Sequence, residues 1–115
     1  MTSSSFQHLD VATLAGWLDA ARPLTLVDIR DPASFAAGHL PGSRHLDNDG
    51  VPALLAEADR ETPLVVVCYH GNSSQQAAAW LAGQGFDDVY SLDGGFTDWR
   101  TQHPERVASG DVDGT

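Results

Sequence analysis

The feature that most restricts the fold is a continuous apolar run, Leu64-Val-Val-Val-Cys68. All five residues are apolar, and the three valines are β-branched, which favours an extended strand. A strand with no polar alternation is typical of one buried on both faces, as in parallel sheets covered by helices on each side. The run therefore predicts an interior strand of an α/β domain.

Strand-like and helix-like segments alternate along the rest of the chain. We expect further strands at residues 24–29 and 89–92, with a brief extended run at 44–46. Helices are expected at residues 11–21, 33–37, 51–58, 74–84 and 96–103. This alternation predicts one α/β domain, residues 1–104, with a mainly parallel central sheet flanked by helices on both faces. Residues 105–115 are expected to form an acidic, flexible C-terminal tail.

The charge balance excludes several classes of function. Sixteen acidic residues against six basic ones give a formal charge of −10. Such a chain repels nucleic-acid phosphates and anionic lipid, so we expect neither nucleic acid nor membrane as a partner. No basic and apolar leader begins the chain, and its single cysteine, Cys68, cannot form an internal disulfide. These features predict a cytoplasmic protein.

The segment after the apolar run holds most of the chemistry: Cys68-Tyr-His-Gly-Asn-Ser-Ser74. It links the predicted strand to the predicted helix, so the thiol should lie at the carboxyl edge of the sheet beneath a helix N-terminus. Free N–H groups and the helix dipole favour an anion there and lower the pKa of a thiol. Gly71 allows a loop to curl so that its amides converge, and Ser73 or Ser74 is a candidate helix cap.

A lone cysteine after a valine run is more often a small buried apolar residue than a nucleophile. Because Gly71, Ser73 and Ser74 follow Cys68, a buried apolar residue and a nucleophile are about equally good interpretations of this cysteine. The residues alone leave this choice open.

Three segments together resemble the rhodanese family, and in particular its single-domain bacterial thiosulfate sulfurtransferases of the GlpE type. One is the cysteine loop itself. The others are Val27-Asp-Ile-Arg-Asp-Pro32 with Phe35 and Gly38-His-Leu-Pro-Gly42, and Val89-Tyr-Ser-Leu-Asp-Gly-Gly-Phe96 with Trp99. They stand in the family's order and cover roughly residues 24–104. The resemblance implies a single rhodanese-like domain.

The resemblance also implies a two-step sulfur transfer. The thiolate of Cys68 takes the outer sulfur of thiosulfate and releases sulfite, and the resulting persulfide passes its sulfur to cyanide or to a dithiol such as a thioredoxin-like protein. No cofactor and no metal are implied. The implied substrate-binding residues are those of the loop: Tyr69, His70, Gly71, Asn72, Ser73 and Ser74. Many relatives carry arginine where this loop has Tyr69 and Ser73, which implies weak thiosulfate affinity and a small, open pocket.

Three other functions compete with this one. Cysteine phosphatases and related arsenate reductases hold their substrate with an arginine six residues after the cysteine, where this chain has Ser74, or one residue later, where it has Gln75. A rhodanese-like interaction module typically lacks the cysteine. A persulfide carrier, loaded by another protein, would use the same Cys68.

The remaining polar and aromatic residues have simpler interpretations. Asp28 and Arg30 share one side of a strand end, which predicts an ion pair that braces nearby loops. His70 is a weaker candidate for tuning the cysteine. His39 and His45 lack a familiar metal-ligand spacing. The three tryptophans fall on three predicted helices, where packing is the expected role: Trp17, Trp80 and Trp99.

Overall fold

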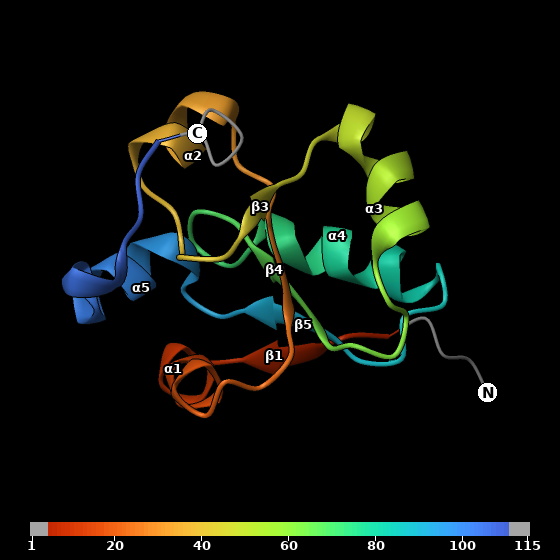
Figure 1. The fold of residues 1–115 in the computed structure, drawn as a ribbon, viewed down its shortest axis with the longest axis horizontal. Coiled ribbons are helices and arrows are strands. Elements are labelled where there is room, and N and C mark those ends of the chain that lie inside the picture. Colours follow the sequence, from red (N-terminus) through yellow and green to blue (C-terminus); the bar gives the residue numbers. More distant parts are fainter. Residues whose placement is uncertain (1–4, 111–115) are drawn as a thin grey trace.

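The computed structural model describes residues 5–110 of the 115-residue chain. Its centre is one sheet of five strands in the order β1-β5-β4-β2-β3. All neighbouring strands in this sheet run parallel. The strands are β1 (Gln7–Leu9), β2 (Thr25–Asp28), β3 (Arg44–His45), β4 (Leu64–Val67) and β5 (Val89–Leu92). The predicted parallel α/β architecture is confirmed (Figure 1).

Four helices connect successive strands and a fifth follows β5: α1 (Val11–Asp19), α2 (Pro32–Ala37), α3 (Val51–Glu57), α4 (Ser73–Ala82) and α5 (Gly95–Gln102). Short 3-10 turns lie at Asn48–Gly50 and Pro104–Arg106. Buried residues of α1 and α5 pack together on one face of the sheet, and those of α3 and α4 pack on the other. None of the helices in residues 5–110 is long and apolar enough to cross a membrane.

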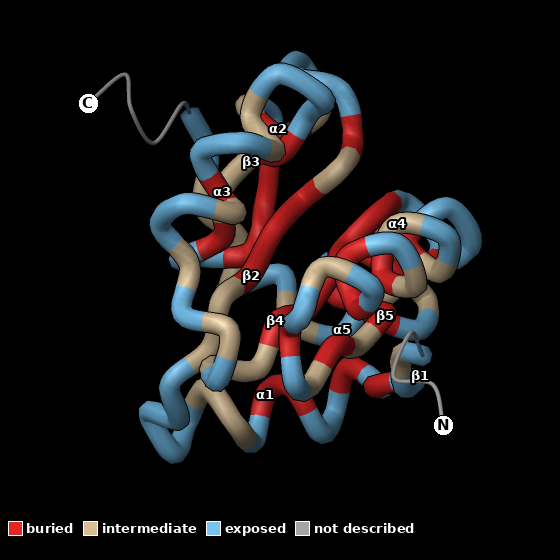
Figure 2. The backbone as a smooth tube through the Cα atoms, turned by 90° about the vertical axis from the view of Figure 1, so that its right-hand side faces the viewer, coloured by how far each residue is buried: buried red, intermediate tan, exposed pale blue. Residues whose placement is uncertain are grey.

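Strand β4 explains the apolar run. Val65 and Val67 belong to the core beneath α1 and α5, whereas Leu64 and Val66 belong to the core beneath α3 and α4. All four side chains are fully buried, because side chains of a strand alternate between two faces that are both covered. Figure 2 shows the burial running along β2, β4 and β5.

Side chains cap the first two helices. Asp10 caps α1, and Asp31 caps α2 by accepting from the Ser34 N–H, with a proline in the first turn. The proposed serine cap of α4 is wrong: Asn72 precedes the helix, and no side chain caps it. The Ser74 hydroxyl bonds elsewhere.

Two further segments differ from the expectation. Strand β1 was not expected, and it pairs with β5 at the edge of the sheet. Residues 105–110 are not free: the Trp99 indole donates to the Arg106 carbonyl, and Ala108 and His39 exchange backbone hydrogen bonds. Residues 1–4 of the predicted domain and 111–115 of the predicted tail lie outside the described residues.

Candidate active site

Cys68 directly follows β4 at the carboxyl edge of the sheet, five residues before the start of α4. Its side chain is buried, with 4% of the residue exposed. The predicted position, between a buried strand and a helix N-terminus, is confirmed. The intervening loop curls back over the sulfur.

Three polar groups surround the sulfur. The N–H of Gly71 donates to Sγ of Cys68 at 3.1 Å and the N–H of Ser74 at 3.3 Å, while Oγ of Ser74 lies 3.2 Å away. Burial raises the pKa of the Cys68 thiol. The Ser74 hydroxyl and the surrounding N–H groups lower it by more, so the pKa lies below its ordinary value. The site thus stabilises a thiolate, the nucleophilic form of cysteine.

Sequence reasoning missed one polar residue beside this site. Ser91 on β5 is fully buried, and its hydroxyl lies 2.7 Å from the hydroxyl of Ser74. A single serine in a strand gives no signal in the sequence. The clue to Ser91 is that its hydroxyl is buried on a strand face that is otherwise apolar. That burial can be recognised only once the fold is known.

The remaining loop residues surround the mouth of the site. Tyr69, His70, Asn72 and Ser73 line a pocket of about 330 Å³ that contains Cys68 at one wall. Ile29, Arg30 and Asp31, which follow β2, form the opposite wall. The six loop residues are therefore brought together around one cysteine, although only Gly71 and Ser74 donate hydrogen bonds to its sulfur.

The side chain of Tyr69 ties the loop to the start of α2. Its hydroxyl donates to the Asp31 carboxylate at 2.7 Å and also contacts the Ser34 hydroxyl. The hydrogen bond from Tyr69, followed by those from Ser34, holds the pKa of the Asp31 carboxyl well below its usual range. Asp31 is therefore a fixed negative charge on the pocket wall.

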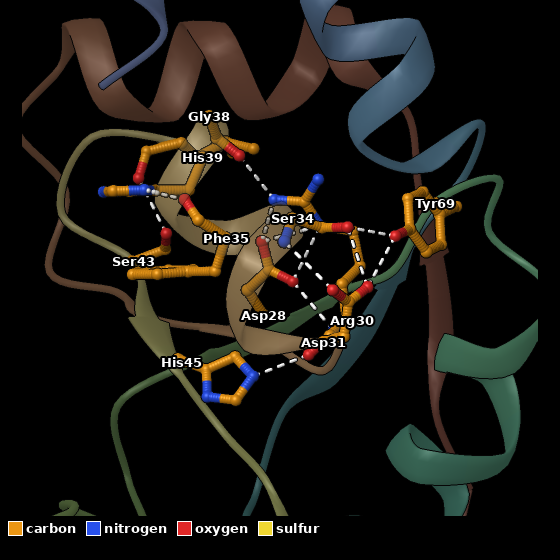
Figure 3. A network of polar contacts seen from close by, with 11 residues as sticks. Asp28, Arg30, Asp31, Ser34, Phe35, Gly38, His39, Ser43, His45 and Tyr69 are labelled. Carbon is orange, nitrogen blue, oxygen red and sulfur yellow. Dashed lines mark hydrogen bonds and ion pairs between the residues drawn. The ribbon is translucent and has the colours of Figure 1, made fainter. Parts of the chain in front are cut away.

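The predicted ion pair between Asp28 and Arg30 is present and buried. The guanidinium donates to both carboxylate oxygens of Asp28, at 2.7 to 3.1 Å, and to the Gly38 carbonyl at 2.6 Å (Figure 3). It also lies 4.2 Å from the centre of the Phe96 ring. The Asp28 carboxylate thus already neutralises the Arg30 guanidinium on the pocket wall. Through these contacts, Arg30 links β2, α2 and α5.

Helix α5 fixes the backbone of the cysteine loop. The Phe96 N–H donates to the Cys68 carbonyl at 2.8 Å, and the Thr97 N–H donates to the Tyr69 carbonyl at 3.0 Å. This close approach requires Gly95, where a Cβ would lie 2.4 Å from the Tyr69 carbonyl oxygen. Gly94 and Gly95 both have a positive φ, +77° and +61°, so the chain turns sharply into α5 at this point.

A larger groove adjoins the sulfur pocket. It has a volume of about 750 Å³ and lies between α3 and α4. Ile29 and Ser73 line both the groove and the pocket, so the two lie side by side. Trp80 forms part of its wall and is 51% exposed, whereas Trp99 is fully buried. Packing therefore explains Trp99 but not Trp80.

The histidines raised as metal candidates have other partners. His39 is buried, and its Nδ1 bonds with the Phe35 carbonyl. Nε2 of His45 bonds with the Arg30 carbonyl. Within residues 5–110, no three His, Cys, Asp or Glu side chains lie close enough to hold a metal ion.

Comparisons with known proteins agree with this geometry. A family model described as "Rhodanese-like domain" matches residues 10–102. The chain is 61% identical over 88 residues to the thiosulfate sulfurtransferase GlpE of Pseudomonas aeruginosa, covering 76% of this chain and 80% of that protein. The corresponding protein of Pseudomonas putida is 59% identical over the same length and shares.

Solved structures share the fold. A rhodanese-like domain protein from Staphylococcus aureus superposes with a TM-score of 0.73 at 23% identity, over 82% of this chain and 91% of that one. A rhodanese-related protein from Thermoplasma volcanium superposes with a TM-score of 0.71 at 24% identity, over 84% and 93%.

Proposed function

Because this chain belongs to the rhodanese family, we propose that it is a thiosulfate sulfurtransferase whose Cys68 carries the transferred sulfur as a persulfide. One observation carries the proposal most directly. The only cysteine of the chain lies at the wall of a small pocket, with two backbone N–H groups directed at its sulfur and a serine hydroxyl within hydrogen-bond distance of it. Such donors stabilise an anion without a metal or a cofactor.

In the first step, the thiolate of Cys68 attacks the outer sulfur of thiosulfate. A bond forms between the cysteine sulfur and that outer sulfur, while the S–S bond of thiosulfate breaks and its electron pair leaves with sulfite. The products are a cysteine persulfide anion and sulfite, and the total charge is unchanged. Each turnover therefore begins by loading one sulfur onto one thiol.

The loop residues keep these anions in place. We propose that the N–H groups of residues 69–74 bind the substrate and the persulfide, as an oxyanion hole binds a developing charge. The absence of Asp, Glu, Lys and Arg from residues 63–86 supports this assignment, because no formal charge on the strand, loop or helix opposes the anion. With neutral donors alone, affinity for thiosulfate is expected to be weak.

In the second step, an acceptor attacks the outer sulfur of the persulfide and the thiolate of Cys68 is released. Cyanide yields thiocyanate. A dithiol takes the sulfur and then closes to a disulfide, releasing hydrogen sulfide, so that the dithiol is oxidised and the sulfane sulfur reduced. We propose a thiosulfate:cyanide type of activity in the assay and a dithiol of a thioredoxin-like protein in the cell.

The groove beside the pocket supports a protein acceptor. Its volume exceeds that of the sulfur pocket about two-fold, and because Ile29 and Ser73 line both, a segment bound in the groove would lie next to the persulfide pocket. The exposed indole of Trp80 offers apolar area of the kind that interfaces use. We expect Trp80→Ala to raise the KM for a thioredoxin-like dithiol. Trp17→Ala, a tryptophan on the opposite face of the sheet, is the matched control.

Mass spectrometry of the protein treated with thiosulfate tests the function. A mass gain of one sulfur atom on Cys68, lost again after cyanide, supports it. No mass gain at any thiosulfate concentration contradicts it. A persulfide carrier is the second candidate: it would gain sulfur from a protein persulfide and none from thiosulfate. A cytoplasmic location remains a prediction.

A further inference from the structure

Two buried serines lie behind the nucleophile, next to the apolar core between the sheet and α4. Ser91 occupies β5 and, like its neighbour Val89 two residues earlier, faces α4. Ser74 lies in the first turn of α4. Both residues are fully buried. Burying a hydroxyl costs free energy unless it forms a hydrogen bond, so these two serines require an explanation.

The explanation lies in a chain of three side chains. The hydroxyls of Ser91 and Ser74 are 2.7 Å apart, and Oγ of Ser74 is 3.2 Å from Sγ of Cys68. Within residues 5–110, Ser74 is the one hydrogen-bond partner of the Ser91 hydroxyl. Ser91 does not touch the sulfur itself. Any influence that it has on the sulfur must pass through Ser74.

The charge of the sulfur sets the direction of these hydrogen bonds. A thiolate only accepts, and a serine hydroxyl has one hydrogen to donate. With Cys68 ionised, Ser74 therefore donates to the sulfur, and its oxygen is left to accept the hydrogen of Ser91. Donation by Ser91 strengthens the next bond in such a chain, because successive hydrogen bonds polarise one another.

We propose that Ser91 is a positioning residue that holds the Ser74 hydroxyl with its hydrogen directed at the sulfur of Cys68. This inference rests on the proposed function, in which the thiolate is the working form. Among the hydrogen bonds that lower the pKa of Cys68, that of Ser74 is the largest. Losing the Ser91 hydroxyl should weaken this bond and raise the pKa of Cys68 by roughly half a unit.

Other titratable and charged groups also surround the sulfur. Tyr69 and His70 belong to its own loop, and Arg30, paired with Asp28, and Asp31 lie on the facing wall. Asp93 follows β5 and pairs with His8. A serine-to-alanine change at residue 91 alters none of these charges, so a difference between variants reports the serine hydroxyl.

The experiment measures the rate of Cys68 alkylation by iodoacetamide as a function of pH, which gives the thiol pKa without any thiosulfate. We expect Ser91→Ala to raise that pKa by roughly half a unit. At a pH below the pKa, this shift lowers the thiolate fraction about three-fold. The matched control is Ser43→Ala. Ser43 is a buried serine whose hydroxyl donates to the nearby Leu40 carbonyl, its one partner among residues 5–110, and its loss should leave the pKa of Cys68 unchanged.

A double-mutant cycle separates positioning from simple packing. If Ser91 acts through Ser74, then Ser91→Ala should have no effect on the pKa in a Ser74→Ala background. An equal shift in both backgrounds, or no shift in the single variant, would overturn the proposal. Thiosulfate loading measured in parallel tests the proposed function independently: a protein that shifts its pKa yet never gains sulfur refutes the sulfurtransferase and leaves the positioning role intact.

Discussion

Among substitutions that add a single methyl group, Gly95→Ala should disturb the site most. Gly95 has a φ of +61°, and an added Cβ would lie 2.5 Å from the Cys68 carbonyl oxygen and 2.4 Å from that of Tyr69. These atoms are backbone, and both carbonyls accept hydrogen bonds from α5. The overlap can be relieved only by moving α5 away from the cysteine loop.

The size of the effect follows from a comparison with Gly42. Gly42 has a φ of +87°, and an added Cβ there meets nothing within 4 Å, so Gly42→Ala incurs only backbone strain of about 1–3 kcal/mol. Gly95→Ala adds overpacking of about 1–3 kcal/mol and weakens two backbone hydrogen bonds. Strain and overpacking together give about 2–6 kcal/mol, and weakening the two hydrogen bonds adds up to about 1 kcal/mol each. We therefore expect Gly95→Ala to lower the free energy of unfolding by about 2–8 kcal/mol, a large part of the 5–15 kcal/mol typical of a domain.

Urea unfolding of both variants, combined with the rate of persulfide formation, tests this reasoning. The displaced loop should slow sulfur capture in Gly95→Ala by up to about a hundred-fold, as misplacement of a reacting atom by about 1 Å can do. Gly42→Ala should keep the wild-type rate. Equal unfolding free energies and equal rates for the two variants would refute the view that α5 rigidly fixes the nucleophile.

Three further outcomes are expected. Cys68→Ser should abolish sulfur transfer to cyanide and leave the urea midpoint nearly unchanged, because the replacement is close in size; retained turnover would contradict the assignment. Arg30→Met should cost about 3–5 kcal/mol of stability in urea unfolding, since it leaves the buried Asp28 carboxylate unpaired, and adding Asp28→Asn should recover part of it. Raising ionic strength from about 0.01 to 0.15 M should increase kcat/KM for thiosulfate, because salt screens the −10 charge and the Asp31 carboxylate; a steady fall would indicate a local positive field.

The elements that could be predicted from sequence are those with a strong local pattern. Strand β4 was predictable because both of its faces are covered, so that Leu64 to Val67 form an unbroken apolar run. Strand β1 was not, because it is three residues long at the edge of the sheet and only Leu9 is buried. Its extended conformation depends on pairing with β5, which lies about eighty residues later in the chain.

The candidate active site also has a part that could be predicted from sequence and a part that could not. The cysteine, its loop and the following helix are adjacent in sequence, so their arrangement at one sheet edge could be derived from strand and helix geometry. The role of Ser74 could not: its hydroxyl bonds to Cys68 and to Ser91 rather than capping α4. That choice depends on the position of β5, because a serine near a helix start caps the helix unless a better partner is within reach.

The lengths of the two edge strands also affect whether strands of other protein chains can pair with the sheet. The sheet ends at β1 and β3, which have three and two residues. An open sheet edge recruits foreign strands through its row of unpaired backbone groups, and edges this short present few of them. The protein should therefore resist edge-to-edge aggregation even at high concentration, and a partner gains little by adding a strand to its sheet.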